Sequence, residues 1–185
     1  AVPPFFDPSN PDTPAGLDPA VSIDAIAEVP SQGTGLSGQV FIPGEGQSLW
    51  SIGKLLELLA TTSAAQTFTA SELVYSGKNS QTTLAEFLGD DAASLSGDGD
   101  IEFGPTGLQL NGYLYIPEGT HEISVASDDG FLLNVGGVNF SSFLGNRGTD
   151  ETGRVAEFEG GLNEVEMYYF DGGGGMSLSL LIDGL

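Results

Sequence analysis

The stretch GYLYIPEGTHEISVASDDG, residues 112–130, decides the fold of this chain. It holds two short runs with apolar residues at alternate positions, 112–116 and 122–126, separated by a segment that contains proline and glycine. Alternation of this kind predicts strands with one buried face, and Gly, Pro and Asp are typical of the connections between strands. We therefore expect two strands here, the second of which runs toward the adjacent aspartates Asp128 and Asp129.

Four more strands are predicted further along the chain, at residues 131–135, 154–158, 163–170 and 176–182. In the third of these, the apolar side chains of Val165, Met167 and Tyr169 alternate with Glu164, Glu166 and Tyr168, so we expect one buried face and one largely solvated face. Short strands at this spacing favour an antiparallel sandwich or barrel. The segment 140–153 is predicted to be a long glycine-rich loop.

Two short helices are predicted before these strands. Residues 48–59 place leucine and isoleucine at helical spacing, with Ser48 as the expected N-cap; the stripe consists of Leu49, Ile52, Leu55, Leu56 and Leu59. Residues 83–88 carry Thr83 and Glu86 in a capping-box pattern, and Gly89 stands where the helix is expected to end. The fold class is therefore all-β, an antiparallel sandwich or barrel with one or two short helices.

The first part of the chain differs in composition from the rest. Residues 1–20 hold six of the ten prolines, which disfavours both a helix and a central strand. We interpret residues 1–34 as an extended linker or wrapping arm and residues 35–185 as one domain. The absence of an initiator Met at Ala1 indicates a piece of a larger protein.

Charge and composition exclude several classes of partner. The 185 residues include 26 acidic and 4 basic side chains, a net charge of −22, so the chain has no basic patch for nucleic acid or anionic membranes. No apolar run approaches the roughly 18 residues that span a bilayer, so membrane insertion is not expected. There is no cysteine, whereas glycine is abundant at 28 residues. Acidic surfaces with glycine-rich turns suit a salty, calcium-containing extracellular medium.

The best candidate for chemistry combines Asp128 and Asp129 with the loop Asp171-Gly172-Gly173-Gly174-Gly175. Neighbouring side chains on a strand point to opposite faces, so both carboxylates reach one cation only if a tight turn or a cis peptide interrupts the strand. Hard divalent cations take six to eight oxygen ligands, so a second loop is needed. Four consecutive glycines let main-chain carbonyls turn inward and let a ligand approach the backbone.

Other polar residues have simpler interpretations. Asp90 and Asp91 are expected to be solvated acids near a helix end. Asp98 and Asp100 fit an acidic turn better than a second, structural calcium site. His121 is expected to be structural or exposed. No set of nucleophile, base and orienting residue is found, so the chain is not expected to be an enzyme.

The residues also resemble a known family. The runs 112–120 and 123–130, the turn Gly136-Gly137 and the run 158–165 resemble the domain named after anthrax protective antigen, which also occurs in yeast flocculins and bacterial RTX adhesins. The resemblance extends from residue 35, where the run 35–40 looks like the family's opening strand, to residue 185. It implies a lectin-like, protective-antigen-type β-sandwich.

For the lectin branch, the resemblance implies a calcium ion held by two adjacent aspartates joined by a cis peptide, together with a second loop. The implied metal ligands are Asp128, Asp129, Asp171, Gly172 and Gly174. The implied sugar-binding residues are the same three aspartates with Gly173, Gly174 and Gly175, and the loop residues Asn146 and Arg147 are candidates for further sugar contact or for a surface loop without a role.

The leading functional hypothesis is a calcium-dependent carbohydrate-binding module of a bacterial cell-surface adhesin. Its partners would be cell-surface glycans or monosaccharides with vicinal diols, such as fucose, mannose or glucose, bound directly through the calcium. A single site of this kind is weak, so display on long or clustered chains is expected, with the domain itself monomeric. The alternatives are a structural or extender module stiffened by calcium, and an enzyme or its accessory domain.

Overall fold

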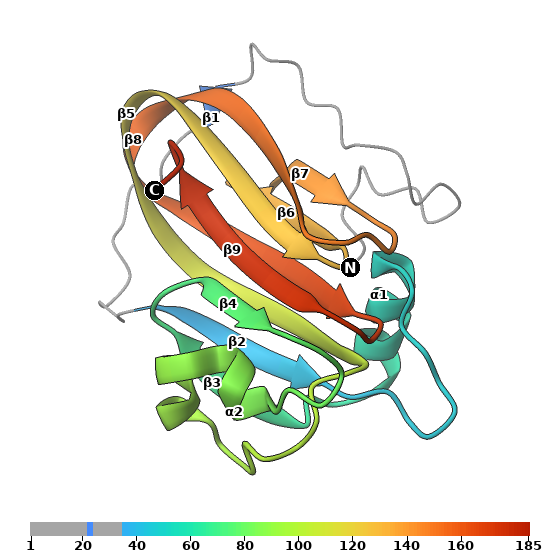
Figure 1. Cartoon of the computed structure of the whole chain (residues 1–185). Coiled ribbons are helices and arrows are strands. Elements are labelled where there is room, and N and C mark those ends of the chain that lie inside the picture. The colour runs from blue at the N-terminus through green and yellow to red at the C-terminus, as the bar shows by residue number, and fades with distance from the viewer. Residues whose placement is uncertain (1–21, 24–34) are drawn as a thin grey trace.

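The computed structural model describes residues 22–23 and 35–185. Its frame is a pair of long antiparallel strands, β5 (Thr106–Asp128) and β8 (Asp150–Asp171), which pair along nearly their whole length. Both strands curve over at one end of the molecule (Figure 1). The separate strands predicted at 112–116 and 122–126 are thus parts of β5, and those at 154–158 and 163–170 are parts of β8.

The predicted connection within residues 117–121 is a bend and not a turn. Ile116 is paired with Gly161 and Glu118 with Glu159, so the ladder resumes at once after Pro117. Gly119, Gly160 and Gly161 have positive φ angles of 127°, 79° and 127°. Such angles are accessible to glycine at little cost, and they let both strands curve together without losing their pairing.

The curvature gives two layers, because each long strand pairs with different neighbours in its two halves. The first layer contains the start of β5 and the end of β8, flanked by β2 (Leu36–Phe41) and β3 (Gln66–Ala70) on one side and β6 (Phe131–Val135) and β7 (Val138–Phe143) on the other. The second contains the end of β5 and the start of β8, with β9 (Met176–Ile182), β4 (Val74–Gly77) and β1 (Ser22–Ile23). The predicted antiparallel sandwich is confirmed.

Individual strands agree with the sequence to different degrees. The strands predicted at 131–135 and 176–182 coincide with β6 and β9, and the opening strand expected from the resemblance coincides with β2. The prediction of a loop over 140–153 was wrong at both ends, because 140–143 belong to β7 and 150–153 belong to β8. Asn139, Ser141 and Ser142 of this strand are buried, so their polarity does not mark solvent exposure. The strands β3 and β4 were not predicted.

The main core lies between the layers and is rich in aromatic side chains. Phe87, Phe103 and Tyr169 are almost fully buried, and the Phe87 ring stacks on Phe103 at a centroid distance of 4.0 Å. Phe87 comes from α2 (Leu84–Leu88), which is followed by the 3₁₀ helix η1 (Gly89–Ser94). The predicted capping box of α2 is confirmed: the Glu86 backbone N–H donates to the Thr83 hydroxyl, and the Thr83 backbone N–H donates to the Glu86 carboxylate.

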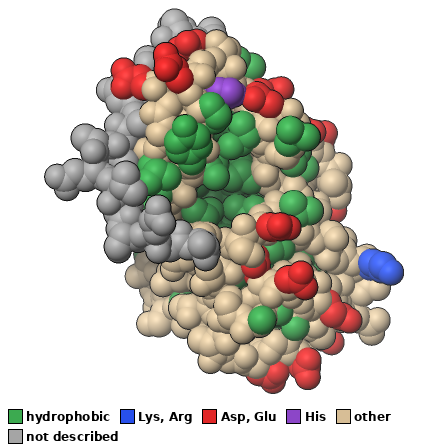
Figure 2. Space-filling view, turned by 90° about the vertical axis from the view of Figure 1, so that its left-hand side faces the viewer, with side chains coloured by type: hydrophobic (Ala, Val, Ile, Leu, Met, Phe, Trp, Pro, Cys, Tyr) green, Lys and Arg blue, Asp and Glu red, His purple; other side chains and the backbone are tan. Residues whose placement is uncertain are grey.

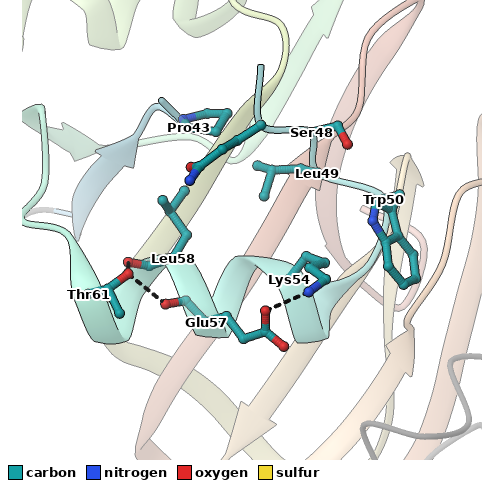
Figure 3. A pocket seen from close by; sticks show the side chains of 9 residues that line it. Pro43, Ser48, Leu49, Trp50, Lys54, Glu57, Leu58 and Thr61 are labelled. Atoms are coloured by element: carbon teal, nitrogen blue, oxygen red, sulfur yellow. Dashed lines mark hydrogen bonds and ion pairs between the residues drawn. The ribbon is translucent and has the colours of Figure 1, made fainter. Parts of the chain in front are cut away.

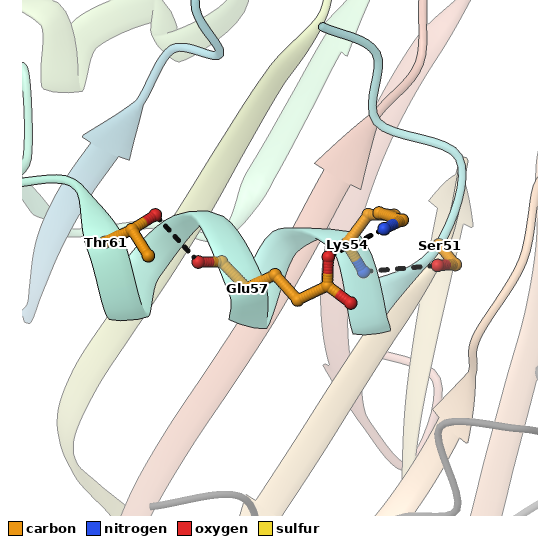
Figure 4. A network of polar contacts seen from close by, with 4 residues as sticks. All are labelled: Ser51, Lys54, Glu57 and Thr61. Atoms are coloured by element: carbon orange, nitrogen blue, oxygen red, sulfur yellow. Dashed lines mark hydrogen bonds and ion pairs between the residues drawn. The ribbon is translucent and has the colours of Figure 1, made fainter.

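The helix α1 (Ile52–Thr61) covers the outer face of the first layer. It begins later than predicted, because Ser51 and not Ser48 is its N-cap and accepts a hydrogen bond from the backbone of Lys54 at 3.2 Å (Figure 4). Residues 48–50 therefore stay outside the helix. The helix also buries Tyr168, so the expected solvated face of β8 is covered at this position.

Acidic side chains lie both on the surface and in the interior. On the face in Figure 2, Asp and Glu side chains are scattered around a hollow with a hydrophobic floor. Asp91, however, is not solvated as expected: it is buried and accepts hydrogen bonds from the Ser71 hydroxyl and backbone and from the Tyr75 hydroxyl. Burial raises the pKa of Asp91, but these hydrogen bonds outweigh burial and lower that pKa.

Most of the linker or arm predicted at residues 1–34 lies outside the described residues. Its described part, Ser22–Ile23, pairs in parallel with Glu157 and Phe158 of β8. Within the part of the chain that the structure describes, no helix has the length and apolar character needed to cross a membrane.

The capping box of α2 provides a test of the fold. Thr83→Ala removes an N-cap hydroxyl that holds the helix carrying Phe87, so we expect a loss of about 1 kcal/mol in the free energy of unfolding, measured by urea denaturation. The matched control is Gln81→Ala at an exposed neighbouring position. Equal stabilities of the two variants would show that the capping box contributes nothing.

Candidate functional site

The two long strands bring distant acidic residues to the same end of the sandwich. Thr106 at the start of β5 pairs with Asp171 at the end of β8, while Asp128 at the end of β5 pairs with Ser177 near the start of β9. Because β5 curves over, its two ends lie close together, one in each layer. Asp128 and Asp171 therefore meet, although 42 residues separate them along the chain.

The Asp128-Asp129 peptide bond is cis. The Asp129 carboxylate is held by two backbone amides: Arg147 donates to Oδ1 at 3.0 Å and Gly172 donates to Oδ2 at 2.8 Å. The backbone carbonyl of Asp128 accepts a hydrogen bond from the Tyr169 hydroxyl. Burial, and then the charge of Asp129, raise the pKa of the Asp128 carboxyl. The pair is thus fixed by the loops on both sides of it.

The carboxylate of Asp171 is the least satisfied polar group of the site. The residue is fully buried, and neither of its carboxylate oxygens has a hydrogen-bond partner among the described residues. Burial and the charges of Asp129 and Asp128 raise the pKa of Asp171 to about 7, while the nearby Gly173 backbone amide opposes this rise without reaching hydrogen-bond geometry. A buried carboxylate without partners is costly unless it is protonated or paired with a cation.

The glycine loop lies directly against the aspartates. A Cβ on Gly172 would fall 2.6 Å from the Leu49 carbonyl oxygen and 3.3 Å from Asp129 Oδ2, and a Cβ on Gly175 would fall 3.4 Å from Asp128 Oδ2. Gly173 and Gly174 have φ angles of 113° and 118° and are exposed. The loop therefore needs glycine both for its close approach to the carboxylates and for its conformation, and its tip is open to solvent.

The structure also places Asn146 and Arg147 at this end, in different roles. Asn146 is exposed, and its Oδ1 lies 3.8 Å from the position of a Cβ on Gly172, so it stands on the rim of the site. The guanidinium of Arg147 instead donates to the Ser127 carbonyl, the Ser127 hydroxyl and the Thr152 hydroxyl, at 3.2, 2.9 and 2.7 Å. It also lies over the rings of Phe131 and Phe143, which ties it to the protein.

These donors fit a hard cation with mixed ligands. Burial and the charge of Asp129 raise the pKa values of Asp128 and Asp171, so the three carboxylates lie near one another, yet no three His, Cys, Asp or Glu side chains in the described ranges form a compact metal cluster by themselves. Calcium accepts backbone carbonyls and water along with carboxylates, so it does not require such a cluster. The unpartnered Asp171 carboxylate and the exposed glycine backbone supply the two kinds of oxygen that it takes.

Comparison with solved structures identifies proteins that share this fold. No family model and no curated protein matches the chain. Among solved structures, the PA14 domain of the MpAFP antifreeze protein is similar with a TM-score of 0.70, 24% identity and coverage of 85% of this chain and 87% of that one. A PA14 sugar-binding domain from an RTX adhesin has a TM-score of 0.68, 26% identity and coverage of 80% and 89%.

The chain has the PA14 fold. PA14 is the protective-antigen-type domain that the sequence resembles, so the expected family likeness is confirmed at the level of structure. The Epithelial Adhesin 6 A domain of Candida glabrata, solved in complex with Galb1-3GlcNAc, also shares the fold, with a TM-score of 0.62, 13% identity and coverage of 83% and 81%.

Sequence reasoning missed several residues that contact the aspartates or the glycine loop of this site. Tyr169 was expected only as a core residue, yet its hydroxyl reaches the Asp128 carbonyl. Thr149 Oγ1 lies 3.5 Å from Asp128 Oδ2 and 3.2 Å from Ser177 Oγ. The Leu49 carbonyl comes from a segment predicted to be helical. Tyr169 is close to Asp171 in sequence, but none of these residues is close to Asp128 and Asp129, so only the three-dimensional structure reveals their contacts.

The contacts of Arg147 predict a positioning role. Arg147→Met keeps much of the apolar stem but removes three hydrogen bonds around Ser127 and Thr152, so we expect about 1–3 kcal/mol less stability in urea denaturation. Lys78→Met, at an exposed position, is the control for the lost positive charge. If Arg147→Met unfolds at the same urea concentration as this control, the guanidinium does not hold the site.

The pKa of Asp171 predicts how the calcium-free protein responds to pH. The pKa is about 7 in the folded protein against an ordinary value of 3.8, so the unfolded chain loses this proton at lower pH than the folded chain. The contribution of Asp171 to stability therefore falls as the pH rises from about 4 through 7. We expect the melting temperature in EDTA to be lower at pH 8 than at pH 5.5.

Asp171→Asn isolates this effect from the general repulsion among acidic residues. Its melting temperature in EDTA should depend less on pH than that of the wild type, and calcium at pH 8 should raise it less. Asp90→Asn removes one exposed charge elsewhere and serves as the control. A response of Asp171→Asn equal to that of Asp90→Asn, in pH and in calcium, would contradict the assignment of Asp171 to this site.

Proposed function

We propose that this PA14 domain is a calcium-dependent carbohydrate-binding module of a bacterial cell-surface adhesin. The observation that carries the proposal is the buried, unpartnered carboxylate of Asp171 beside Asp128 and Asp129, at an end of the sandwich where the glycine loop is exposed. The similarity to a PA14 sugar-binding domain from an RTX adhesin, at 26% identity over 80% of this chain, supports the same function.

The calcium would be held by the carboxylates of Asp128, Asp129 and Asp171 and by backbone carbonyls of Gly172 and Gly174. The ion would supply positive charge and open coordination positions for sugar hydroxyls. The chain itself orients Asp129 through the backbone amides of Arg147 and Gly172. The orientation is set before any ligand arrives, which lowers the entropic cost of binding.

The sugar would be recognised as a vicinal diol. Its hydroxyl oxygens would face the ion, while its hydroxyl hydrogens would be donated to the free lone pairs of the aspartates. Gly173, Gly174 and Gly175 present no side chain, so a pyranose ring can approach the backbone closely. Asn146 on the rim has both an amide donor and a carbonyl acceptor for a further hydroxyl. Fucose, mannose and glucose all offer such diols.

The structural or extender module is the second candidate function. A calcium ion that only stiffens the sandwich would be enclosed by protein ligands on all sides. Here the exposed positions of Asn146 and of Gly173 to Gly175 leave one side of the site open, which favours an external ligand. The expectation that the chain is not an enzyme stays a prediction, as does its extracellular location.

Titration calorimetry with fucose, mannose and glucose tests the proposal. We expect weak binding of at least one of these sugars in calcium, and no binding in EDTA. Asp128→Asn and Asp129→Asn should abolish it, since each removes a charged oxygen ligand of the ion. Asp90→Asn, at an exposed position, should bind as the wild type does.

Three outcomes have distinct meanings. Binding that persists in EDTA would overturn calcium dependence. A calcium-induced rise in melting temperature without binding of any of the three sugars would favour the structural module. If calcium does not raise the melting temperature and no sugar binds, both readings of the site are contradicted.

A further inference from the structure

We infer that Trp50, with the cleft beside it, forms a second sugar subsite that binds the next residue of a glycan whose first residue sits on the calcium. The inference rests on the proposed function, since the first sugar positions the second. It concerns a part of the chain, the entry to α1, for which neither composition nor motif indicates a binding role.

The backbone on both sides of Trp50 is held next to the glycine loop. The peptide unit that joins Leu49 to Trp50 lies against Gly172, because a Cβ on Gly172 would fall 2.6 Å from the Leu49 carbonyl oxygen. Gly172 in turn donates its backbone N–H to Asp129. Two residues further on, the Ile52 backbone N–H donates to the Leu144 carbonyl at 2.9 Å. Trp50 is therefore fixed between the glycine loop and the segment that precedes Asn146.

Trp50 itself is exposed to solvent. It is the only tryptophan of the chain, and 51% of its surface is accessible although Leu49 and Ser51 on either side are buried. An indole that stays in solvent between two buried neighbours does not gain the free energy of burying its apolar surface. Large exposed aromatic side chains of this kind mark binding surfaces more often than do isolated aliphatic ones.

A cleft of about 420 Å³ lies next to Trp50. Figure 3 shows it between the loop that carries Pro43, Ser48 and Leu49 and the helix that carries Lys54, Glu57 and Leu58, with the indole at one end. This volume falls within the range of small-ligand sites. The cleft therefore has room for a sugar ring without any rearrangement of α1.

Charged and polar side chains line the cleft beside the indole. Lys54 Nζ lies 2.7 Å from Glu57 Oε2 and 5.8 Å from the centroid of the Trp50 ring. Among the described residues, the second carboxylate oxygen of Glu57 has no hydrogen-bond partner. The Gln47 side chain accepts a hydrogen bond from the Gly44 backbone through its carbonyl, and its amide donors have no partner in the same part of the chain. The C–H face of a pyranose complements the electron-rich face of indole, while its hydroxyls complement an acid, an ammonium and an amide.

The occupant is therefore a neutral sugar residue attached to the one on the calcium. An anionic partner is disfavoured by Glu57 and by the net charge of −22. A purely apolar partner would cover the second carboxylate oxygen of Glu57 and the amide donors of Gln47 without offering them hydrogen bonds, which is costly. Continuity with the Asp129 site through Gly172 explains why the two sugars would belong to one glycan.

Calorimetry with matched mono- and disaccharides tests the inference. The probes are fucose with Fucα1-2Gal, mannose with α1,2- and α1,3-mannobiose, and glucose with maltose and laminaribiose, all in calcium. We expect at least one disaccharide to bind roughly three- to tenfold more tightly than its parent monosaccharide. Trp50→Ala should remove this gain and leave the affinity for the monosaccharide unchanged. Tyr115→Ala, which removes an aromatic side chain that is 64% exposed on β5, is the control.

Because the chain has one tryptophan, its fluorescence reports directly on this subsite. The disaccharide that binds more tightly should shift the emission of Trp50 in calcium and not in EDTA, whereas its parent monosaccharide should change the emission little. This readout uses the wild-type chain, so it does not depend on the folding of the variant.

The outcomes separate the two proposals. If a monosaccharide binds but no disaccharide binds more tightly, or if Trp50→Ala weakens both equally, the second subsite is overturned while the calcium site stands. If no sugar of either size binds, the proposed function fails and the inference fails with it.

Discussion

The pairing of β5 with β8 is the constraint on which the rest of the structure depends. These strands stay paired while they curve from one layer into the other, so each layer of the sandwich begins from the same hydrogen-bonded ladder. The curvature closes the core around Phe87, Phe103 and Tyr169. It also returns the end of β5 to the end of β8, and the site exists only because those two ends meet. A straight pair of strands of this length would place Asp128 and Asp171 at opposite ends of the molecule.

Placing three aspartates at one point is unfavourable by itself. Burial and repulsion from neighbouring aspartates raise the pKa values of Asp128 and Asp171, while the backbone amides of Arg147 and Gly172 hold the two carboxylate oxygens of Asp129. The rest of the protein does not share this pattern, since the other buried carboxylate, Asp91, is satisfied by Ser71 and Tyr75 within the described residues. The two buried carboxylates Asp91 and Asp171 therefore differ in whether the fold supplies their hydrogen-bond partners. A carboxylate with a structural role has its partners in the fold, whereas Asp171 has none among the described residues, which is what the proposed cation site would require.

The sequence predicts much of this because the decisive signals are local. The apolar run at 131–135, the alternation in 176–182, the Thr83 capping box and the position of the glycine loop depend on residues close together in the chain. The predictions that were wrong also have physical reasons. The bend at Gly160 and Gly161 looks like a strand end, and β7 is buried although it carries Asn and Ser. The helix α1 begins only at Ile52, after its N-cap Ser51, and the Leu49 carbonyl before it lies against Gly172. Arg147 was a candidate for sugar contact, and its engagement with Ser127 and Thr152 depends on partners that no local pattern reveals.

The late start of α1 connects the fold to the proposed binding surface. Were the helix to begin at Ser48, as its apolar stripe suggests, Leu49 and Trp50 would turn with the first helical turn and the Leu49 carbonyl would bond within the helix. Instead that carbonyl lies against Gly172, and the backbone of Ile52 is bonded to Leu144. The segment 49–52 thus links the glycine loop to the chain that precedes Asn146. The proposed calcium site and the proposed Trp50 subsite would therefore be connected through one peptide unit and not through a long path.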